Sequence, residues 1–353
     1  MDIKKYAFKA KEFLYNEWLF FLSLIIFFAT SIYLKRVPQI SKDEMEVLFI
    51  LTMFFITIKG LENSGFLTYL AAKMERGSFL HIKLILLTFF ISSFITNDVA
   101  LVTVVPLTLA LNIKNKDLLV ILEAITANGA ELFPFGSPQN LYIYWHYNLS
   151  FLEFIKTMAP FVAAMFVFVM TAATIIPFKV YEKRTLSVHI KKREVYPYLF
   201  FFILIVMTII KIVPLYTAFV VFFYSLLLNR EALKIDYMLL LIFLLFFGIA
   251  DNLSTIFSQV LNHPHHIFFL SLLLSQLMSN VPATLLLAEF TQEWKALLWG
   301  VNVGGYGLLW GSLASLIAYR LYTGKFGDRG RFLAKFLLLN FLALFVGVAA
   351  YYY

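Results

Sequence analysis

Long apolar stretches separated by short polar loops run through almost the whole chain of 353 residues. An α-helix needs about 20 apolar residues to cross a bilayer. Two stretches, 80–112 and 265–291, are too long for one comfortable crossing, and each carries polar residues at its middle. These are Thr96-Asn97-Asp98 in the first and Ser279-Asn280 in the second. The remaining candidate spans lie at 17–34, 46–62, 118–146, 157–178, 197–213, 215–228, 237–250, 293–320 and 332–351.

Composition supports a membrane protein that crosses the bilayer many times. Hydrophobic residues make up 61% of the chain and charged residues only 14%, whereas soluble domains carry about 25% charged residues. The basic, amphipathic N-terminus is followed by no small-residue cleavage site, so we expect no cleavable signal peptide. The absence of cysteine excludes disulfides and thiolate chemistry.

Loop charge predicts how the two long stretches are inserted. Basic loops at 71–83 and 112–117 flank the stretch 80–112, and lysine and arginine concentrate in cytoplasmic loops. That stretch should therefore enter and leave on one side as a re-entrant hairpin, with 265–291 entering from the opposite face. We expect a cytoplasmic (inner) membrane location, the N-terminus inside and the C-terminus outside. The loop 35–43 is the one exception to this charge rule.

The expected fold class is an all-α polytopic membrane protein, an inverted-topology repeat with two re-entrant hairpins and two broken transmembrane helices. The N-terminal repeat covers 1–178, a basic cytoplasmic linker covers 179–196, and the C-terminal inverted repeat covers 197–353. Each hairpin precedes a span with a glycine-rich interruption, which reads ANGAELFPFGSPQN at 127–140 and VNVGGYGLLWGSLAS at 301–315.

Such interruptions point to a binding site. In hydrocarbon every backbone polar group must be satisfied within the protein, so a break survives only inside protein or beside a water-filled cavity. Its freed carbonyls and half-helix N-termini can bind ions. The candidate site residues are Thr96, Asn97, Asp98, Asn128, Gly129, Glu131, Gly136, Ser137, Pro138, Asn140, Ser279, Asn280, Thr284, Asn302, Gly304, Gly305 and Ser312. The alternative explanation for these glycines, and for Gly300 and Gly307, is that they allow helices to pack closely.

Ionisable side chains inside spans are costly and mark functional positions. We expect Asp98 and Glu131 to carry proton or sodium coupling. Glu123 is either a proton relay or an interhelical hydrogen-bond donor. Glu62 and Asp251 are expected to cap or brace a hairpin, with Lys59 neutralising Glu62 one turn away.

Several functions are disfavoured. No protease, esterase or nucleotide-binding motif is present, so we expect neither an enzyme nor a cofactor. The net charge of +8 fits loops facing anionic lipid rather than nucleic acid. His263, His265 and His266 crowd one external loop, but no carboxylate flanks them, and we do not expect a metal site there.

The motifs ITNDVALVTVVPLTLAL and ANGAELFPFGSPQNLYIY, with LMSNVPATLLLAEF and VNVGGYGLLWGSLAS, resemble the two halves of the ion transporter superfamily. This group includes citrate transporters, divalent anion:sodium symporters, arsenite permeases and sodium/proton antiporters. The resemblance implies an elevator-like movement, a homodimer and sodium binding at the tips, here Thr96, Asn97, Ser279 and Asn280. Asp98 stands where the dicarboxylate branch has threonine, as in the antiporter and arsenite branches.

The sequence therefore predicts a secondary active transporter of a small, anionic solute, coupled to Na⁺ or H⁺. The alternatives are a sodium/proton antiporter, which the acidic centre favours, and an arsenite-type efflux permease. A passive channel and an intramembrane enzyme are the alternatives from other classes.

Overall fold

The computed structural model describes residues 17–74, 79–182, 190–256 and 263–353, and these are predominantly helical. The first group of helices is α2 (Trp18–Leu34), α3 (Lys42–Asn63), α4 (Phe66–Met74), α5 (Leu80–Phe94), α6 (Asn97–Ala110), α7 (Lys116–Gly129), α8 (Pro138–His146) and α9 (Phe151–Ile175). The second group is α10 (Lys192–Ile209), α11 (Phe219–Leu228), α12 (Tyr237–Ile256), α13 (Pro264–Met278), α14 (Asn280–Ala288), α15 (Trp294–Val303), α16 (Leu313–Phe326) and α17 (Arg329–Tyr352).

The chain repeats one order of elements. In the first half, the paired helices α5 and α6 are followed by the interrupted helix α7–α8 and the long helix α9. In the second half, the pair α13 and α14 is followed by the interrupted helix α15–α16 and the long helix α17. Each interruption contains a short 3-10 turn, η1 (Pro134–Gly136) or η4 (Leu309–Gly311).

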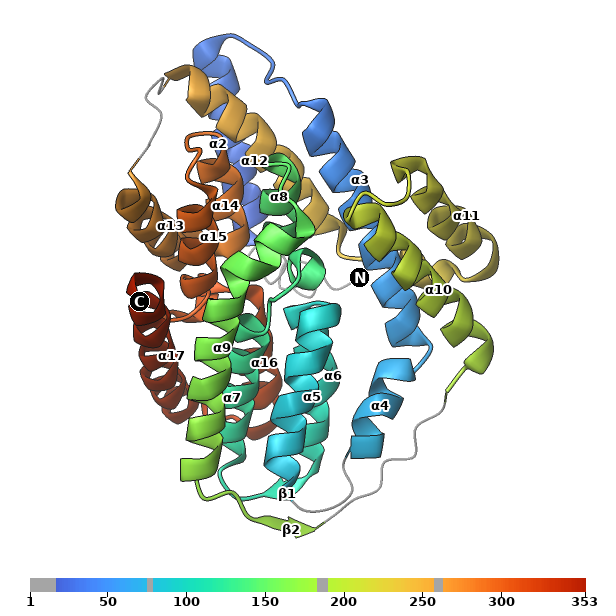
Figure 1. Cartoon of the computed structure of the whole chain (residues 1–353), viewed down its shortest axis with the longest axis vertical. Helices are drawn as coiled ribbons and strands as arrows, with labels where there is room; N and C mark the ends of the chain where they lie inside the picture. Colours follow the sequence, from blue (N-terminus) through green and yellow to red (C-terminus); the bar gives the residue numbers. More distant parts are fainter. Residues whose placement is uncertain (1–16, 75–78, 183–189, 257–262) are drawn as a thin grey trace, which may run out of the picture.

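The two halves interlock around these elements. The second arm of each pair packs against the interrupted helix of the other half, α6 against α16 and α14 against α8. The long helices α9 and α17 also lie against each other (Figure 1). The two helical pairs and the two interruptions therefore meet inside the molecule.

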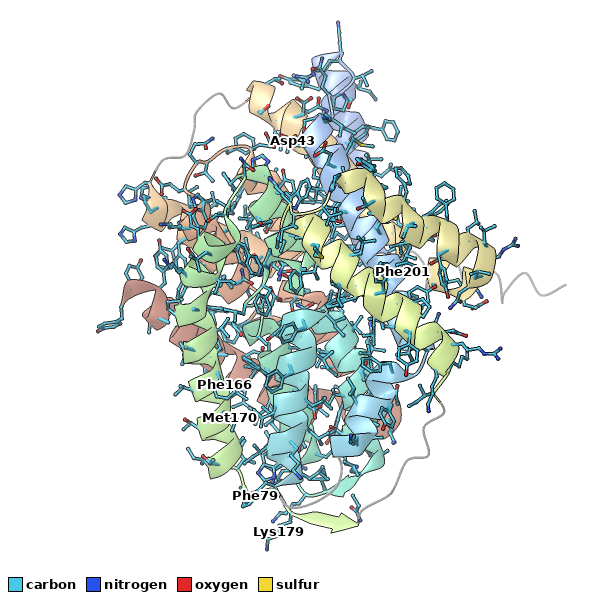
Figure 2. The ribbon with its side chains drawn as sticks, turned by 45° about the vertical axis from the view of Figure 1, so that its right-hand side comes forward. Asp43, Phe79, Phe166, Met170, Lys179 and Phe201 are labelled. Atoms are coloured by element: carbon cyan, nitrogen blue, oxygen red, sulfur yellow. The ribbon has the colours of Figure 1, made fainter. Side chains whose placement is uncertain are left out.

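Apolar surface covers the molecule between its polar ends. Figure 2 shows Asp43 and Lys179 near opposite ends, with apolar side chains such as Phe166 and Met170 on α9 between them. Among the described residues, the runs Phe151–Ile175, Arg230–Thr255 and Arg329–Tyr352 are long and apolar enough to cross a membrane. Leu152, Val167 and Ile175 on α9 are exposed although apolar, which suits contact with lipid.

A small sheet departs from the purely helical expectation. β1 (Asn112–Ile113) pairs antiparallel with β2 (Val180–Glu182), and Lys114 N–H donates to Lys179 O at 2.8 Å. The segments that follow α6 and α9 lie side by side here, and their backbone groups find partners in each other. The sequence offers no alternating pattern for strands this short.

Two salt bridges pair partly buried charges outside the centre. Lys59 Nζ lies 2.9 Å from Glu62 Oε2, so these two charges neutralise each other as expected. Asp251 pairs with Arg36 and accepts from Gln39 N–H at 2.8 Å. Asp251 therefore ties the α2–α3 loop to α12, rather than bracing the neighbouring helical pair.

Close helix contact depends on Gly300, and we predict that Gly300→Ala lowers stability. A Cβ there would lie 1.9 Å from Ser271 Oγ and 2.5 Å from Phe268 O on α13, so the two helices must separate. Overpacking of this kind costs about 1–3 kcal/mol. Thermal unfolding of the purified protein in detergent measures the loss. Gly324→Ala is the control, because a Cβ at Gly324 meets nothing within 4 Å, and equal melting temperatures of the two variants would contradict the prediction.

Candidate functional site

A carboxylate surrounded by neutral donors lies at the first interruption. Glu131 is 1% exposed. Its Oε1 accepts from Asn97 Nδ2 at 2.7 Å, and its Oε2 accepts from Ser137 Oγ at 2.6 Å, Asn140 Nδ2 at 3.0 Å and Gln139 Nε2 at 3.1 Å. Within the described ranges, no lysine, arginine or histidine pairs with it. Hydrogen bonds alone satisfy this buried acidic group.

The local sequence makes room for this arrangement. Pro134 and Pro138 lack N–H groups and prevent a continuous helix, and Ser137 adopts an extended backbone at φ −154° and ψ 154° before α8 begins. The carbonyls freed at the end of α7 are bound from α5, because Ser92 Oγ donates to Ala127 O at 2.6 Å and Ser93 Oγ to Ala130 O at 2.7 Å. The helical pair that precedes the interruption thus binds two of its carbonyls.

A single glutamine supports the second interruption. Gln276 on α13 donates through Nε2 to Gly304 O at 2.6 Å and to Tyr306 O at 2.7 Å, and its Oε1 accepts from Leu308 N–H at 2.8 Å. The chain turns at Gly307 with φ +88°, a conformation that glycine adopts without strain. Ser312 then has an extended backbone like Ser137 (φ −144°, ψ 151°) and caps α16 by accepting from Ser315 N–H.

Two asparagines join the interruptions to each other. Asn128 Nδ2 donates to Ser312 Oγ at 2.9 Å, with longer contacts of 3.4 Å to Gly305 O and Ser315 Oγ. Asn302 Nδ2 donates to Asn140 Oδ1 at 2.8 Å. The Oδ1 of Asn302 is buried without a hydrogen-bond partner among the residues described, so it can accept from a bound ion, water or proton donor.

The two tips differ in how they are held. Thr96 has an extended backbone and caps α6 by accepting from Val99 N–H at 3.4 Å, and Asn97 is bound to Glu131 and Asn128. Ser279 has φ +75° and ψ 157° and makes no capping bond. Among the residues that the structure describes, its Oγ forms a hydrogen bond only to Asn280 Oδ1, at 3.4 Å.

Both tips line one cavity of about 250 Å³. Asn97 and Asp98 contribute from the first tip and Ser279 and Asn280 from the second, with Pro138 and Gln139 at the first interruption. Its wall also contains Glu17, Asp236 and Arg320. A neighbouring cavity of about 240 Å³ is lined by Thr96, Lys59, Glu62 and Lys234 and shares Asp98 and Asp236 with the first.

Some expected site residues lie elsewhere. Thr284 Oγ1 donates to Asn280 O on its own helix at 2.7 Å. Gly129 and Gly304 serve close packing, against Met165 and Ser275 respectively. Glu123 accepts from Thr108 across the α6–α7 contact, and its Oε2 has no partner within the described ranges. The remaining expected residues lie in the hydrogen-bond network, along the cavity or directly beside them, as Gly136 does beside Glu131.

Sequence reasoning missed several residues that complete the site. Gln139 and Ser315 join the central network, and Ser92, Ser93 and Gln276 satisfy the interruptions. Ser92, Ser93 and Gln276 could have been found from the sequence, because each is a polar residue a few positions before a tip. Asp236 and Arg320 gave no such signal, because in the sequence both belong to loops or span ends.

No cluster of three or more histidine, cysteine, aspartate or glutamate side chains suitable for a metal ion occurs in the described part of the chain. Sodium binding at Thr96, Asn97, Ser279 and Asn280 stays a prediction. Hydroxyl, amide and carbonyl oxygens would bind the ion there.

Paired helices whose tips meet interrupted helices around one cavity are typical of membrane transporters. The chain belongs to the citrate transporter family, whose family model matches residues 18–299. It is 35% identical over 328 residues to an uncharacterized transporter of Methanocaldococcus jannaschii, covering 87% of this chain and 89% of that protein. It is also 34% identical over 298 residues to the inner membrane protein YbiR of Escherichia coli, covering 78% of this chain and 79% of that protein.

Asn97 stabilises the buried carboxylate, and we predict that Asn97→Ala lowers the free energy of unfolding. Removal of the amide leaves Oε1 of Glu131 without its donor, which costs about 1–3 kcal/mol. Thermal unfolding in detergent measures the effect. In a Glu131→Leu background the same substitution should cost much less, because the carboxylate is gone. Additive effects of the two substitutions would contradict a direct Asn97–Glu131 interaction.

Proposed function

We propose that this protein is a secondary active transporter that moves a small, anionic solute across the cytoplasmic membrane, coupled to Na⁺ or H⁺. The observation that carries this proposal is the single cavity lined by both tips, Asn97-Asp98 and Ser279-Asn280. Solute bound there would touch both halves of the chain, so its binding could bias how the halves are arranged.

The repeated order of elements supports an inverted-topology repeat. In this arrangement α5–α6 and α13–α14 are re-entrant hairpins from opposite faces of the membrane, and both reach their tips at one depth. The basic loops, including 112–117 and 229–234, then lie in the cytoplasm. The second cavity, lined by Lys234 and by the Lys59–Glu62 pair, would connect the tips to the cytoplasm.

Helix packing supports an elevator movement. α2 packs against α12 and α3 against α10 and α11, with Gly248 close to Phe27 and Gly60 close to Tyr198 at two of these contacts. We assign these helices to a fixed scaffold, which would also carry a homodimer contact. In Figure 1, α2, α3 and α12 extend toward one end and α5, α6, α7 and α9 toward the other. This offset fits a moving part displaced along the membrane normal.

Asp98 is the better candidate for the coupling residue. It lines both cavities, and its Oδ1 has no hydrogen-bond partner in the described part of the chain. Glu131, in contrast, already accepts from Asn97, Ser137, Gln139 and Asn140. A proton or Na⁺ arriving from the cavity reaches Asp98 without breaking an existing bond.

A sodium/proton antiporter is the second candidate function. Three carboxylates, from Glu17, Asp98 and Asp236, line the central cavity, against the one guanidinium of Arg320. A wall of this charge attracts cations. An arsenite-type efflux permease is a further alternative within the same family resemblance.

Transport assays separate these functions. Proteoliposomes that contain purified protein and are loaded with unlabelled solute should transiently accumulate labelled solute above its external concentration, because a carrier exchanges one solute for the other. Labelled solute that only equilibrates, with no effect of the unlabelled solute inside, would indicate a channel. A lumen pH that responds to Na⁺ with no anion supplied would establish the antiporter instead.

The two tip asparagines provide the first functional prediction. Asn97→Ala and Asn280→Ala should each reduce exchange to the background of protein-free liposomes, since each removes an amide from the cavity wall. Asn340→Ala is the matched control, because Asn340 is equally buried but bonds only Phe336 O on its own helix. Normal exchange by either tip variant would refute the paired-tip site.

Asp98→Asn should flatten the pH dependence of transport, because the amide keeps the size of the side chain but cannot exchange a proton. Initial rates across pH 5 to 9, measured at fixed solute concentration, test this. Glu62→Gln is the control, because Glu62 is a carboxylate of the second cavity already paired with Lys59. A pH profile of Asp98→Asn identical to that of the unmodified protein would reduce Asp98 to a structural role.

A further inference from the structure

The two interruptions carry corresponding donors, but only one half has a carboxylate to receive them. In the register that pairs Gly136 with Gly311, Ser137 pairs with Ser312 and Asn140 with Ser315. Glu131 pairs with Tyr306 in the same register. The hydroxyl of Tyr306 donates to Ile125 O on α7 at 3.3 Å, so the second half has no carboxylate at the position that Glu131 occupies in the first.

The second tip accordingly holds an unused donor. Asn280 is 4% exposed and lines the central cavity. In the part of the chain that the structure describes, no group accepts a hydrogen bond from its Nδ2, whereas Nδ2 of Asn97 donates to both Glu131 and Asn128. This amide group lines the cavity and is therefore available to donate a hydrogen bond to a bound solute.

The backbone of the second tip is an independent sign. Ser279, with φ +75° and ψ 157°, lies in a region that essentially only glycine occupies. Such strained residues concentrate at ligand-binding positions, where surrounding structure or ligand maintains them. Thr96 at the first tip is unstrained, with φ −156°. Strain and the unpartnered amide therefore occur together at the tip that lacks an internal carboxylate.

We propose that the Asn280 tip binds the one anionic group of the transported solute, as the Asn97 tip binds the carboxylate of Glu131. Glu131 then occupies the place that a second anionic group would need, so the protein selects solutes with a single carboxylate or oxyanion. This inference rests on the proposed transport function and specifies its solute class. It excludes di- and tricarboxylates as preferred solutes, although the family is named for citrate.

The charged groups around the cavity also disfavour a solute with two negative groups. Arg320 is the one basic side chain in the wall of the central cavity, and Glu17, Asp98 and Asp236 also line it. The N-terminus of α14, which begins at Asn280, adds partial positive charge at the second tip. This partial positive charge favours one negative group beside Asn280, while the three carboxylates that line the same cavity disfavour a second.

Two pairs of probes test the selection in the unmodified, detergent-purified protein. Propionate and succinate differ by one carboxylate, and nitrate and sulfate differ by one negative charge. Binding is followed by thermal shift and by the fluorescence of Trp310, which lines the cavity. We expect at least one monoanion to bind about tenfold or more tightly than its dianionic counterpart. Equal or tighter binding of the dianions, or binding of neither monoanion, would overturn the proposal.

Variants of Glu131 test the reason for that selection. Glu131→Ala empties the place beside Asn97 and should raise the affinity for succinate about tenfold or more. Glu131→Gln is the matched control, because the amide removes the charge but still fills the space, so it should not gain succinate to the same extent. Asn280→Ala should lose the monoanion. Equal succinate gains in both Glu131 variants, or an unchanged monoanion affinity in Asn280→Ala, would count against the site.

Exchange assays in proteoliposomes distinguish this inference from the transport function itself. Exchange of succinate or citrate in preference to propionate and nitrate would overturn the monoanion assignment and leave the transporter standing. Selective monoanion binding with no exchange of any solute would have the opposite meaning, because it supports the anion site and counts against transport.

Discussion

A helix interrupted at membrane depth must find protein partners for every backbone group that it frees, because lipid offers none. Much of the central architecture follows from this constraint. Ser92 and Ser93 bind the carbonyls at the first interruption, and Gln276 binds those at the second. Each helical pair must therefore reach its interruption closely enough for these bonds. The tips then necessarily lie beside the half-helix N-termini, where polar chemistry can occur in an otherwise apolar protein.

The two halves meet this constraint with different chemistry. At the first, the protein supplies its own carboxylate, and Glu131 holds Asn97, Ser137 and Asn140 in one hydrogen-bonded group. At the second, the corresponding serines bind Asn128, and Asn280 remains available to the cavity. The same order of elements thus gives two tips with different contacts, because Asn97 binds Glu131 whereas Asn280 lines the cavity.

Much of the site could be predicted from local patterns. Polar residues within apolar runs identified both tips, and glycine-rich segments identified both interruptions, because each violates a strong requirement of the bilayer. The pairing of Lys59 with Glu62 followed from helical spacing. Asp251 was not predictable in the same way, since its partner Arg36 belongs to a loop more than two hundred positions away. Local spacing carries no information about such a contact.

The sequence by itself determined that this chain is a helical membrane protein with two polar tips and two interrupted helices. Neighbouring residues decide this, because they set the length of each apolar run and whether a helix can continue with all its backbone hydrogen bonds. Only the tertiary structure decided which groups meet. It placed Asp236 and Arg320 in the cavity wall, joined Asn128 to Ser312, and bonded the Tyr306 hydroxyl to Ile125 O on α7. These outcomes depend on how distant helices pack. The same packing makes the two tips different, because it brings Glu131 to Asn97 and leaves Asn280 at the cavity wall.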